Sequence, residues 1–182
     1  MRTILILGAG LSTSSLIRYL LDHAGDSLWK VRVGDIHSGL AGEKVQDHPY
    51  GESFVFDVYD DHQRTMEIRH AHLVISMLPA RMHYLVADSC VKIGRNLVTA
   101  SYLEPRIRAL DEAARKRGIL IMSECGVDPG IDHMSAMQML HRIREEGGKL
   151  MAFESSTGGL VAPGYENNPW PVSYTHLRAH ET

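Results

Sequence analysis

The chain has 182 residues, of which 44% are hydrophobic and 23% are charged, as in an ordinary globular protein. A formal net charge of -3 provides no basic field that would attract nucleic acid or an anionic membrane. The apolar runs are far shorter than the roughly 20 residues that span a bilayer. This length suits one domain and part of a second. We therefore expect a small-molecule substrate, and no nucleic-acid or membrane partner.

The cysteines, the histidines and the N-terminal residues narrow the class of protein further. Cys90 and Cys125 lie far apart, without C-x-x-C spacing, and fit free thiols in a reducing compartment. The 11 histidines show no H-E-x-x-H pattern and no Cys/His cluster, so no metal site is expected. The chain enters an apolar run at residues 3–7 without a signal-peptide pattern. These features predict a cytoplasmic protein.

Short apolar runs alternate with helical patterns along most of the chain. Apolar residues at helical spacing, such as Leu16, Ile17 and Leu20, indicate amphipathic helices between the runs. Strands that alternate with helices predict βαβ units, and hence an α/β fold with a doubly wound parallel sheet of the Rossmann-like, nucleotide-binding type. The expected strands are residues 4–7, 31–33, 54–56, 73–76, 96–99, 119–122 and 150–154.

Two of the later helices are expected to bury particular residues. A helix that opens near Pro105 and ends at Gly118 would bury Ala113 on its apolar face. A helix over 132–146 would bury Met134 and Met137, which recur at helical spacing.

A glycine-rich loop at residues 8–13 follows the first expected strand and precedes a helix. Gly8 permits a tight turn, Gly10 lets a pyrophosphate approach the backbone, and the helix N-terminus offers N–H donors to the phosphates. Thr13 replaces the third glycine of the G-x-G-x-x-G pattern, which is expected to loosen or shift the contact between helix and strand but to keep the anion site. The alternative is a turn without a ligand. The strand–loop–helix context favours a dinucleotide.

Asp35 ends the second expected strand. An acidic residue at this point accepts hydrogen bonds from the ribose hydroxyls of adenosine and repels a 2′-phosphate. Asp35 therefore favours NAD as the cofactor, with NADP as the alternative. The simpler interpretation is an exposed aspartate in a turn.

Polar residues also follow the third and fifth expected strands. Asp57 and Val58 come after the third strand, where they would lie near the adenine. Equally, Asp57 would only place a charge at a helix N-terminus. Ser101 and Tyr102 follow the fifth strand, where their hydroxyls would bind a carboxylate substrate or belong to an ordinary loop.

The most informative segment is residues 123–133, Ser-Glu-Cys-Gly-Val-Asp-Pro-Gly-Ile-Asp-His. It joins an apolar run to a helical pattern, and open α/β sheets bind ligands at the carboxyl ends of their strands. Its titratable candidates are Asp128, Asp132 and His133, and a carboxylate beside a histidine suits proton transfer. We expect Asp128 to be catalytic. Asp132 also suits a helix cap, with His133 in the first turn.

Together, these motifs resemble the saccharopine dehydrogenase family. The likeness covers about residues 1–170, and its specific parts are Asp-Pro-Gly-Ile-Asp-His at 128–133 and Gly-Gly-Leu-Val-Ala-Pro at 158–163. The other similar segments are Gly-Ala-Gly at 8–10, Asp-Val at 57–58, Val-Ile-Ser-Met-Leu-Pro at 74–79, Thr-Ala-Ser-Tyr at 99–102 and Glu-Cys-Gly-Val at 124–127.

The resemblance implies an oxidoreductase of lysine metabolism that interconverts saccharopine with glutamate and 2-aminoadipate 6-semialdehyde. Hydride would pass between the nicotinamide and the carbon of a C–N bond. By position, Ser101, Tyr102 and Asp128 would contact this amino-acid substrate. The implied cofactor contacts are Gly8, Ala9, Gly10, Leu11, Asp35, Asp57, Val58 and Val127.

The resemblance also implies the domain limits. Residues 1–148 would form the dinucleotide-binding domain, and residues 149–170 the beginning of an α+β substrate domain through which a homodimer would form. Residues 171–182 resemble a translated sequencing adapter and are expected to be a non-native tail, with a natural exposed tail as the alternative. On this view the chain is an incomplete enzyme.

Two other functions fit the same motifs. A related imine reductase, such as carboxynorspermidine dehydrogenase, shares the nucleotide domain and the reaction type but takes a substrate with fewer carboxylates. A nucleotide-binding module without catalysis is the other alternative, and the polar segment 124–133 argues against it.

Overall fold

A computed structural model of the chain describes residues 1–154. It contains one sheet of six strands in the order β3-β2-β1-β4-β5-β6, and every neighbouring pair is parallel. This order is that of the doubly wound dinucleotide fold, in which the crevice lies where the strand order reverses, between β1 and β4. The strands are β1 (Arg2–Leu7), β2 (Trp29–Asp35), β3 (Gly51–Val55), β4 (Leu73–Ser76), β5 (Asn96–Thr99) and β6 (Ile121–Met122).

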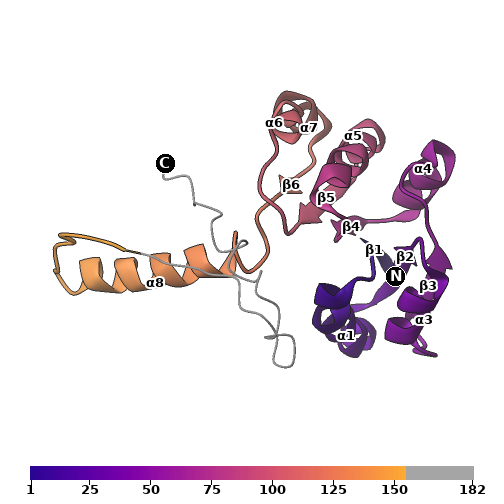
Figure 1. Cartoon of the computed structure of the whole chain (residues 1–182), viewed down its shortest axis with the longest axis horizontal. Helices are drawn as coiled ribbons and strands as arrows, with labels where there is room; N and C mark the ends of the chain where they lie inside the picture. Colours follow the sequence, from indigo (N-terminus) through magenta and orange to yellow (C-terminus); the bar gives the residue numbers. More distant parts are fainter. Residues whose placement is uncertain (155–182) are drawn as a thin grey trace, which may run out of the picture. The chain divides into compact units, whose positions relative to one another are not determined.

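Helices cover both faces of this sheet. In Figure 1, α1 and α3 lie together on one side of the strands, and α4 and α5 lie on the other. The helical elements are η1 (Leu11–Thr13), α1 (Ser14–Asp22), α2 (Ala24–Ser27), α3 (Ser38–Val45), α4 (Asp61–His70), η2 (Ala80–Met82), α5 (His83–Ile93), α6 (Pro105–Arg108), α7 (Asp111–Arg117) and α8 (Ile131–Glu145).

Alternation along β1 creates the two halves of the core. Ile4 and Ile6 point to one face and belong to the cluster that packs against α1 and α3. Leu5 and Leu7 point to the opposite face and belong to the cluster under α4 and α5. Because both faces are covered, β1 is continuously apolar and buried from Ile4 to Leu7 rather than alternating with polar residues, as is typical of a buried parallel strand. The predicted α/β fold with a doubly wound parallel sheet is confirmed.

Three sequence predictions about individual elements are wrong. The helix expected from Pro105 to Gly118 is two helices, α6 and α7, and Ala113 is exposed on the second. Periodicity cannot register the break, because the residues between them keep nearly helical backbone angles, as at Leu110. The strand expected at 150–154 is absent from the described residues, since a strand forms only where a neighbour pairs with it.

The third concerns α8. Met134 and Met137 are exposed, and none of the residues of α8 is buried. Helical spacing predicts which residues share a face, but it does not predict that another element covers that face.

The chain divides into a first compact unit, Met1–Gln138, and a second unit that begins at Met139. The sheet and all the site residues discussed below up to His133 belong to the first unit. The predicted beginning of a substrate domain is described only over residues 149–154, and the expected non-native tail lies outside the described residues. No helix within residues 1–154 is long and apolar enough to cross a membrane.

Candidate active site

The glycine-rich loop leaves the carboxyl end of β1 through Gly8, where the chain passes close to β4. The φ of Gly8 is +100°, and a Cβ at this position would lie 2.7 Å from the carbonyl oxygen of Met77. The amide of Gly8 also donates to the carbonyl oxygen of Gly34 at 2.8 Å, next to the end of β2. Only glycine fits here, because any side chain would meet the backbone of the neighbouring strand.

The next part of the loop is open to a ligand. Gly10 and Leu11 are exposed, and a Cβ at Gly10 would have no heavy atom within 4 Å. The short turn η1 follows directly; the Thr13 amide donates to the Gly10 carbonyl oxygen at 3.1 Å, whereas the earlier amides of a first helical turn generally have no intrahelical acceptors. This arrangement fits the pyrophosphate of a dinucleotide, as predicted for Gly8 to Leu11.

Thr13 is buried and hydrogen-bonded within the loop. It is fully buried, its hydroxyl donates to the carbonyl oxygen of Gly10 at 2.7 Å, and it accepts from the Lys44 ammonium at 3.0 Å. The Gly10 carbonyl oxygen also accepts from the Thr13 amide at 3.1 Å and from the Lys44 ammonium, so the Thr13 hydroxyl adds a further donor to a carbonyl that is already paired. The expected loosening or shift of the contact between helix and strand stays a prediction.

Asp35 is not an exposed turn residue. It is 9% exposed, and its two carboxylate oxygens accept from the amide of Ala9 at 2.7 Å and from the amide of His37 at 2.8 Å. One side chain thus fastens the glycine-rich loop to the end of β2. Each carboxylate oxygen has capacity for a further hydrogen bond, so the group still suits a pair of ribose hydroxyls.

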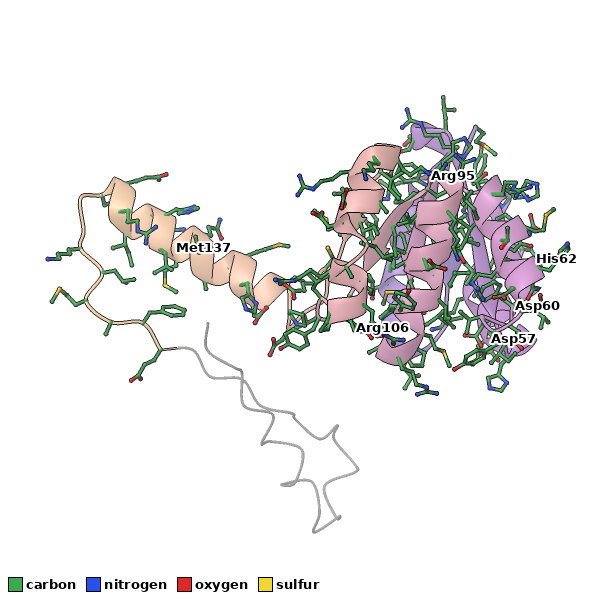
Figure 2. All side chains as sticks on the ribbon, turned by 90° about the horizontal axis from the view of Figure 1, so that it is seen from above. Asp57, Asp60, His62, Arg95, Arg106 and Met137 are labelled. Atoms are coloured by element: carbon green, nitrogen blue, oxygen red, sulfur yellow. The ribbon has the colours of Figure 1, made fainter. Side chains whose placement is uncertain are left out.

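Asp57 and Val58 follow β3 at the same edge of the sheet. Asp57 is exposed and accepts from the amide of Tyr59 at 2.9 Å, whereas the Val58 side chain is buried in the core. In Figure 2, Asp57 and Arg106, which follow strands β3 and β5, lie toward one end of the first unit, and Arg95, which precedes β5, lies toward the other. Asp57 and Val58 remain predicted cofactor contacts.

The segment after β6 is bound to the end of β5 through its backbone. The amide of Glu124 donates to Ser101 at 3.0 Å, and the amide of Cys125 donates to Thr99 at 3.1 Å. The Glu124 carboxylate in turn accepts from the amide of Leu103 at 3.1 Å. The two predicted substrate segments, 101–102 and 124–133, therefore lie side by side.

A tight turn presents Asp128 at this edge. The amide of Gly126 donates to Pro129 at 2.9 Å, and the amide of Ile131 donates back to Gly126 at 3.0 Å. Gly130 has a φ of +147°, and a Cβ there would clash with the backbone of Gly126. Val127 is left exposed beside Asp128, where it remains a predicted cofactor contact.

Asp128 and Tyr102, two of the predicted substrate residues, are hydrogen-bonded to each other. The Tyr102 hydroxyl donates to the Asp128 carboxylate at 3.1 Å, and this hydrogen bond raises the pKa of Tyr102 above its ordinary value. Tyr102 and Asp128, with Ser101, His83 and Arg81, line a hollow of about 540 Å³ within the first unit. A carboxylate, a phenol and a guanidinium in one hollow can receive a zwitterionic ligand.

Asp132 and His133 form a separate pair next to this turn. The Asp132 carboxylate accepts from the amide of Gly130 at 2.9 Å and from the His133 imidazole at 2.8 Å, and this partner raises the pKa of His133. Ligand atoms of Asp128, Asp132 and His133 lie within 4.8 Å of one another, but exposed acidic groups commonly gather without an ion. The cluster therefore carries no metal assignment.

Sequence reasoning missed His83. This histidine is 2% exposed and lies between the ends of β4 and β5, where its ring contacts the hydroxyls of Ser76, Thr99 and Ser101. The signal available in the sequence was a histidine at the start of the helix that follows Pro79, which alone does not distinguish a buried residue from an exposed one.

Two protein-family models match most of this chain. Residues 4–122 match the family model described as the saccharopine dehydrogenase NADP binding domain, and residues 126–176 match the saccharopine dehydrogenase C-terminal domain. The chain belongs to the saccharopine dehydrogenase family. The resemblance expected from the motifs is confirmed.

Relatives in the family are similar along most of this chain. Saccharopine dehydrogenase [NADP(+), L-glutamate-forming] of Pyricularia oryzae is 36% identical over 168 residues, which are 92% of this chain and 36% of that protein. Alpha-aminoadipic semialdehyde synthase of Arabidopsis thaliana is 37% identical over 145 residues, 80% of this chain and 14% of that protein. The apo L-Glu-forming saccharopine dehydrogenase of Saccharomyces cerevisiae has a TM-score of 0.80 at 31% identity, over 94% of this chain and 38% of that one.

The chain thus spans little more than a third of the fungal saccharopine dehydrogenases that it matches. The two family models meet between residues 122 and 126. The compact units divide after Gln138. The domain boundary predicted from the sequence, between residues 148 and 149, coincides with neither of these two divisions and stays a prediction.

The two glycines of the loop provide a matched pair of variants. We expect Gly8→Ala to lower the free energy of unfolding by about 2 kcal/mol, because it combines a strained φ with a backbone clash. Gly10→Ala has open space and an ordinary backbone conformation, so we expect it to raise stability by up to about 1 kcal/mol. Urea unfolding followed by circular dichroism measures both. Equal denaturation midpoints for the two variants would contradict this account of the loop.

Proposed function

We propose that this chain is the nucleotide-binding part of an oxidoreductase that acts on the C–N bond of saccharopine. In the forward direction saccharopine and water would yield glutamate and 2-aminoadipate 6-semialdehyde, while the oxidised nicotinamide cofactor takes up hydride and a proton is released. The observation that carries the proposal is the 36% identity to an L-glutamate-forming saccharopine dehydrogenase over 92% of this chain. The substrate residues predicted from the motifs also lie in one hollow.

The cofactor half of the proposal uses the β1–β2 edge. The cofactor supplies hydride transfer at its nicotinamide. Amides at Gly10 and Leu11 would hold the pyrophosphate, and Asp35 would hold the adenosine ribose. Asp57, Val58 and Val127 complete the proposed contacts, with Val58 contributing through its backbone because its side chain is buried.

The substrate half uses the β5–β6 edge. Ser101 and Tyr102 offer hydroxyls to a carboxylate, and Asp128 offers a negative charge to the amine of saccharopine. The hydrogen bond from Tyr102 holds the Asp128 side chain in place. We assign Asp128 the proton transfers that accompany C–N cleavage, because its carboxylate lines the hollow and accepts from the Tyr102 hydroxyl, whereas Glu104, which also lines the hollow, is paired with Arg106.

Two observations favour different cofactors, one NADP and the other NAD. The family model and the fungal relatives carry NADP in their names. In this chain the strand β2 ends in Asp35, and Ile36 and His37 follow it, so the loop offers a carboxylate and no arginine or lysine to a 2′-phosphate. The preference for NAD predicted from Asp35 remains a prediction for this chain.

A homodimer formed through the second domain and a cytoplasmic location are also proposed. The first is drawn from the resemblance, and the second is supported by two free cysteines without a disulfide framework.

Asp35→Asn tests the cofactor preference. We expect the unmodified chain to bind NADH more tightly than NADPH, and the variant to shift the ratio of the two affinities about tenfold toward NADPH, because a like charge beside the 2′-phosphate is removed. Asp57→Asn is the control and should change both affinities in the same proportion. Fluorescence titration of the chain measures all of them. Tighter binding of NADPH by the unmodified chain would show that Asp35 does not exclude the phosphate.

Asp128→Asn tests the proposed reaction. In the full-length protein that carries this sequence, we expect turnover with saccharopine to fall by at least about 100-fold, because a proton-transfer group contributes that much. Asp111→Asn, an exposed aspartate on α7, should leave turnover unchanged. The rate of reduced cofactor formation is the measurement. Unaltered turnover in Asp128→Asn would remove this residue from catalysis, and no turnover of saccharopine by the unmodified protein would refute the proposed function.

A further inference from the structure

His83 is a buried imidazole surrounded by hydroxyl groups. Its Nδ1 atom lies 2.8 Å from the Ser76 Oγ atom. Its Nε2 atom lies 2.9 Å from the Ser101 Oγ atom and 3.0 Å from the Thr99 Oγ1 atom. Ser101 belongs to the hollow where the substrate is proposed to bind, and the other two hydroxyls are buried.

The sheet itself brings these groups together. Ser76 and Thr99 are the last residues of β4 and β5, and they are paired in the parallel register. His83 is the first residue of α5, which returns over the same edge after the short turn η2. Ser101 follows two residues after Thr99, and its amide lies 3.4 Å from the Thr99 hydroxyl oxygen. The imidazole thus joins the ends of two strands to the substrate segment.

Burial also determines the charge of the ring. Loss of solvent lowers the pKa of His83 below its ordinary value, and the nearby Glu104 carboxylate opposes this effect. The ring is therefore neutral at neutral pH and carries one N–H donor and one lone-pair acceptor.

The two ring nitrogens have different numbers of partners. The Nε2 atom faces two hydroxyl oxygens, and a single lone pair accepts well from only one hydroxyl, whereas an N–H group can be shared between two oxygens. The Nδ1 atom faces the single hydroxyl of Ser76, which can donate to it. This count favours a proton on Nε2.

We propose that His83 is a positioning residue that carries its proton on Nε2, donates it to Ser101 and Thr99, and thereby turns the Ser101 hydroxyl proton toward the hollow as a donor for a substrate carboxylate. A hydroxyl that accepts from the imidazole has its own proton free for another acceptor. Arg81, exposed on the wall of the same hollow, adds positive charge for that anion. The identity of the ligand rests on the proposed function, but the state of His83 does not.

The tautomer of His83 is measurable without any ligand. In a long-range proton–nitrogen correlation spectrum of the isotopically labelled 182-residue chain near neutral pH, we expect the pattern of a neutral ring protonated on Nε2. Ser101→Ala should change the Nε2 signal while leaving Nδ1 nearly unaltered, and Ser76→Ala should do the reverse. A ring protonated on Nδ1, or a charged ring, would overturn the proposal.

Two amide variants then test the positioning role. A glutamine amide reaches the place of Nε2, whereas an asparagine amide reaches only that of Nδ1. In the full-length protein that carries this sequence, saturated with NADH, we expect His83→Gln to keep the affinity for saccharopine within about threefold and His83→Asn to weaken it about tenfold, the loss expected for one hydrogen bond to a charged group. Chemical shifts of the Ser101 and Tyr102 amides report binding. Equal affinities in the two variants would contradict the role.

The tautomer measurement and the binding measurement test the role of His83 and the proposed substrate separately. If saccharopine does not bind the unmodified full-length protein at all, the result counts against the proposed substrate, and the tautomer of His83 and its response to Ser101→Ala still decide whether the imidazole donates to this serine. If saccharopine binds but the ring is protonated on Nδ1, the substrate assignment stands and the proposal for His83 falls.

Discussion

The hydrogen bonds of the Asp35 carboxylate are the constraint on which the rest of the site depends. One oxygen accepts from Ala9 in the glycine-rich loop and the other from His37 beyond β2. A nearly buried carboxylate in this position would be costly without hydrogen-bond donors. The amides of the loop and of the strand end therefore stabilise the Asp35 carboxylate, and the carboxylate in turn orders both segments. Gly8 makes the same junction possible from the other side, because only glycine can pass so close to β4. Loop, strand end and helix N-terminus are thereby fixed before a cofactor arrives.

The other half of the sheet edge is built by a second set of polar contacts. Backbone hydrogen bonds join the segment after β6 to the end of β5, and the His83 imidazole joins the ends of β4 and β5. Ser101 and Asp128 are therefore placed by groups that lie behind them, and not by their own loops alone. Since the carboxyl ends of parallel strands share one edge, the predicted cofactor residues and the predicted substrate residues come to the same side of the sheet.

Sequence patterns predicted most of this arrangement, because its elements are strongly periodic. The apolar run of β1, the glycine-rich loop and the polar residues after each strand are local features, and each lies where it was expected. The contacts of Thr13 and His83 could not be predicted from local patterns, since their partners, such as Lys44 and Thr99, are distant in sequence. Helical periodicity did not predict the break between α6 and α7, because the backbone at Leu110 stays nearly helical. The exposure of Met134 depends on what packs against α8, which helical spacing does not encode.

The most direct test of the account is a chemical-shift map of the labelled chain with NADPH and, separately, with NADH. If the site lies where Asp35 fastens the glycine-rich loop, the backbone signals of residues 8–13 and 35–37 should move on binding. Those of Leu28 and His72, which lie at the amino ends of the strands and contact the backbone of Arg2 and Thr3, should stay in place. Shifts confined to the amino ends, or no saturable shifts with either cofactor, would contradict the central claim that this sheet edge is a dinucleotide site.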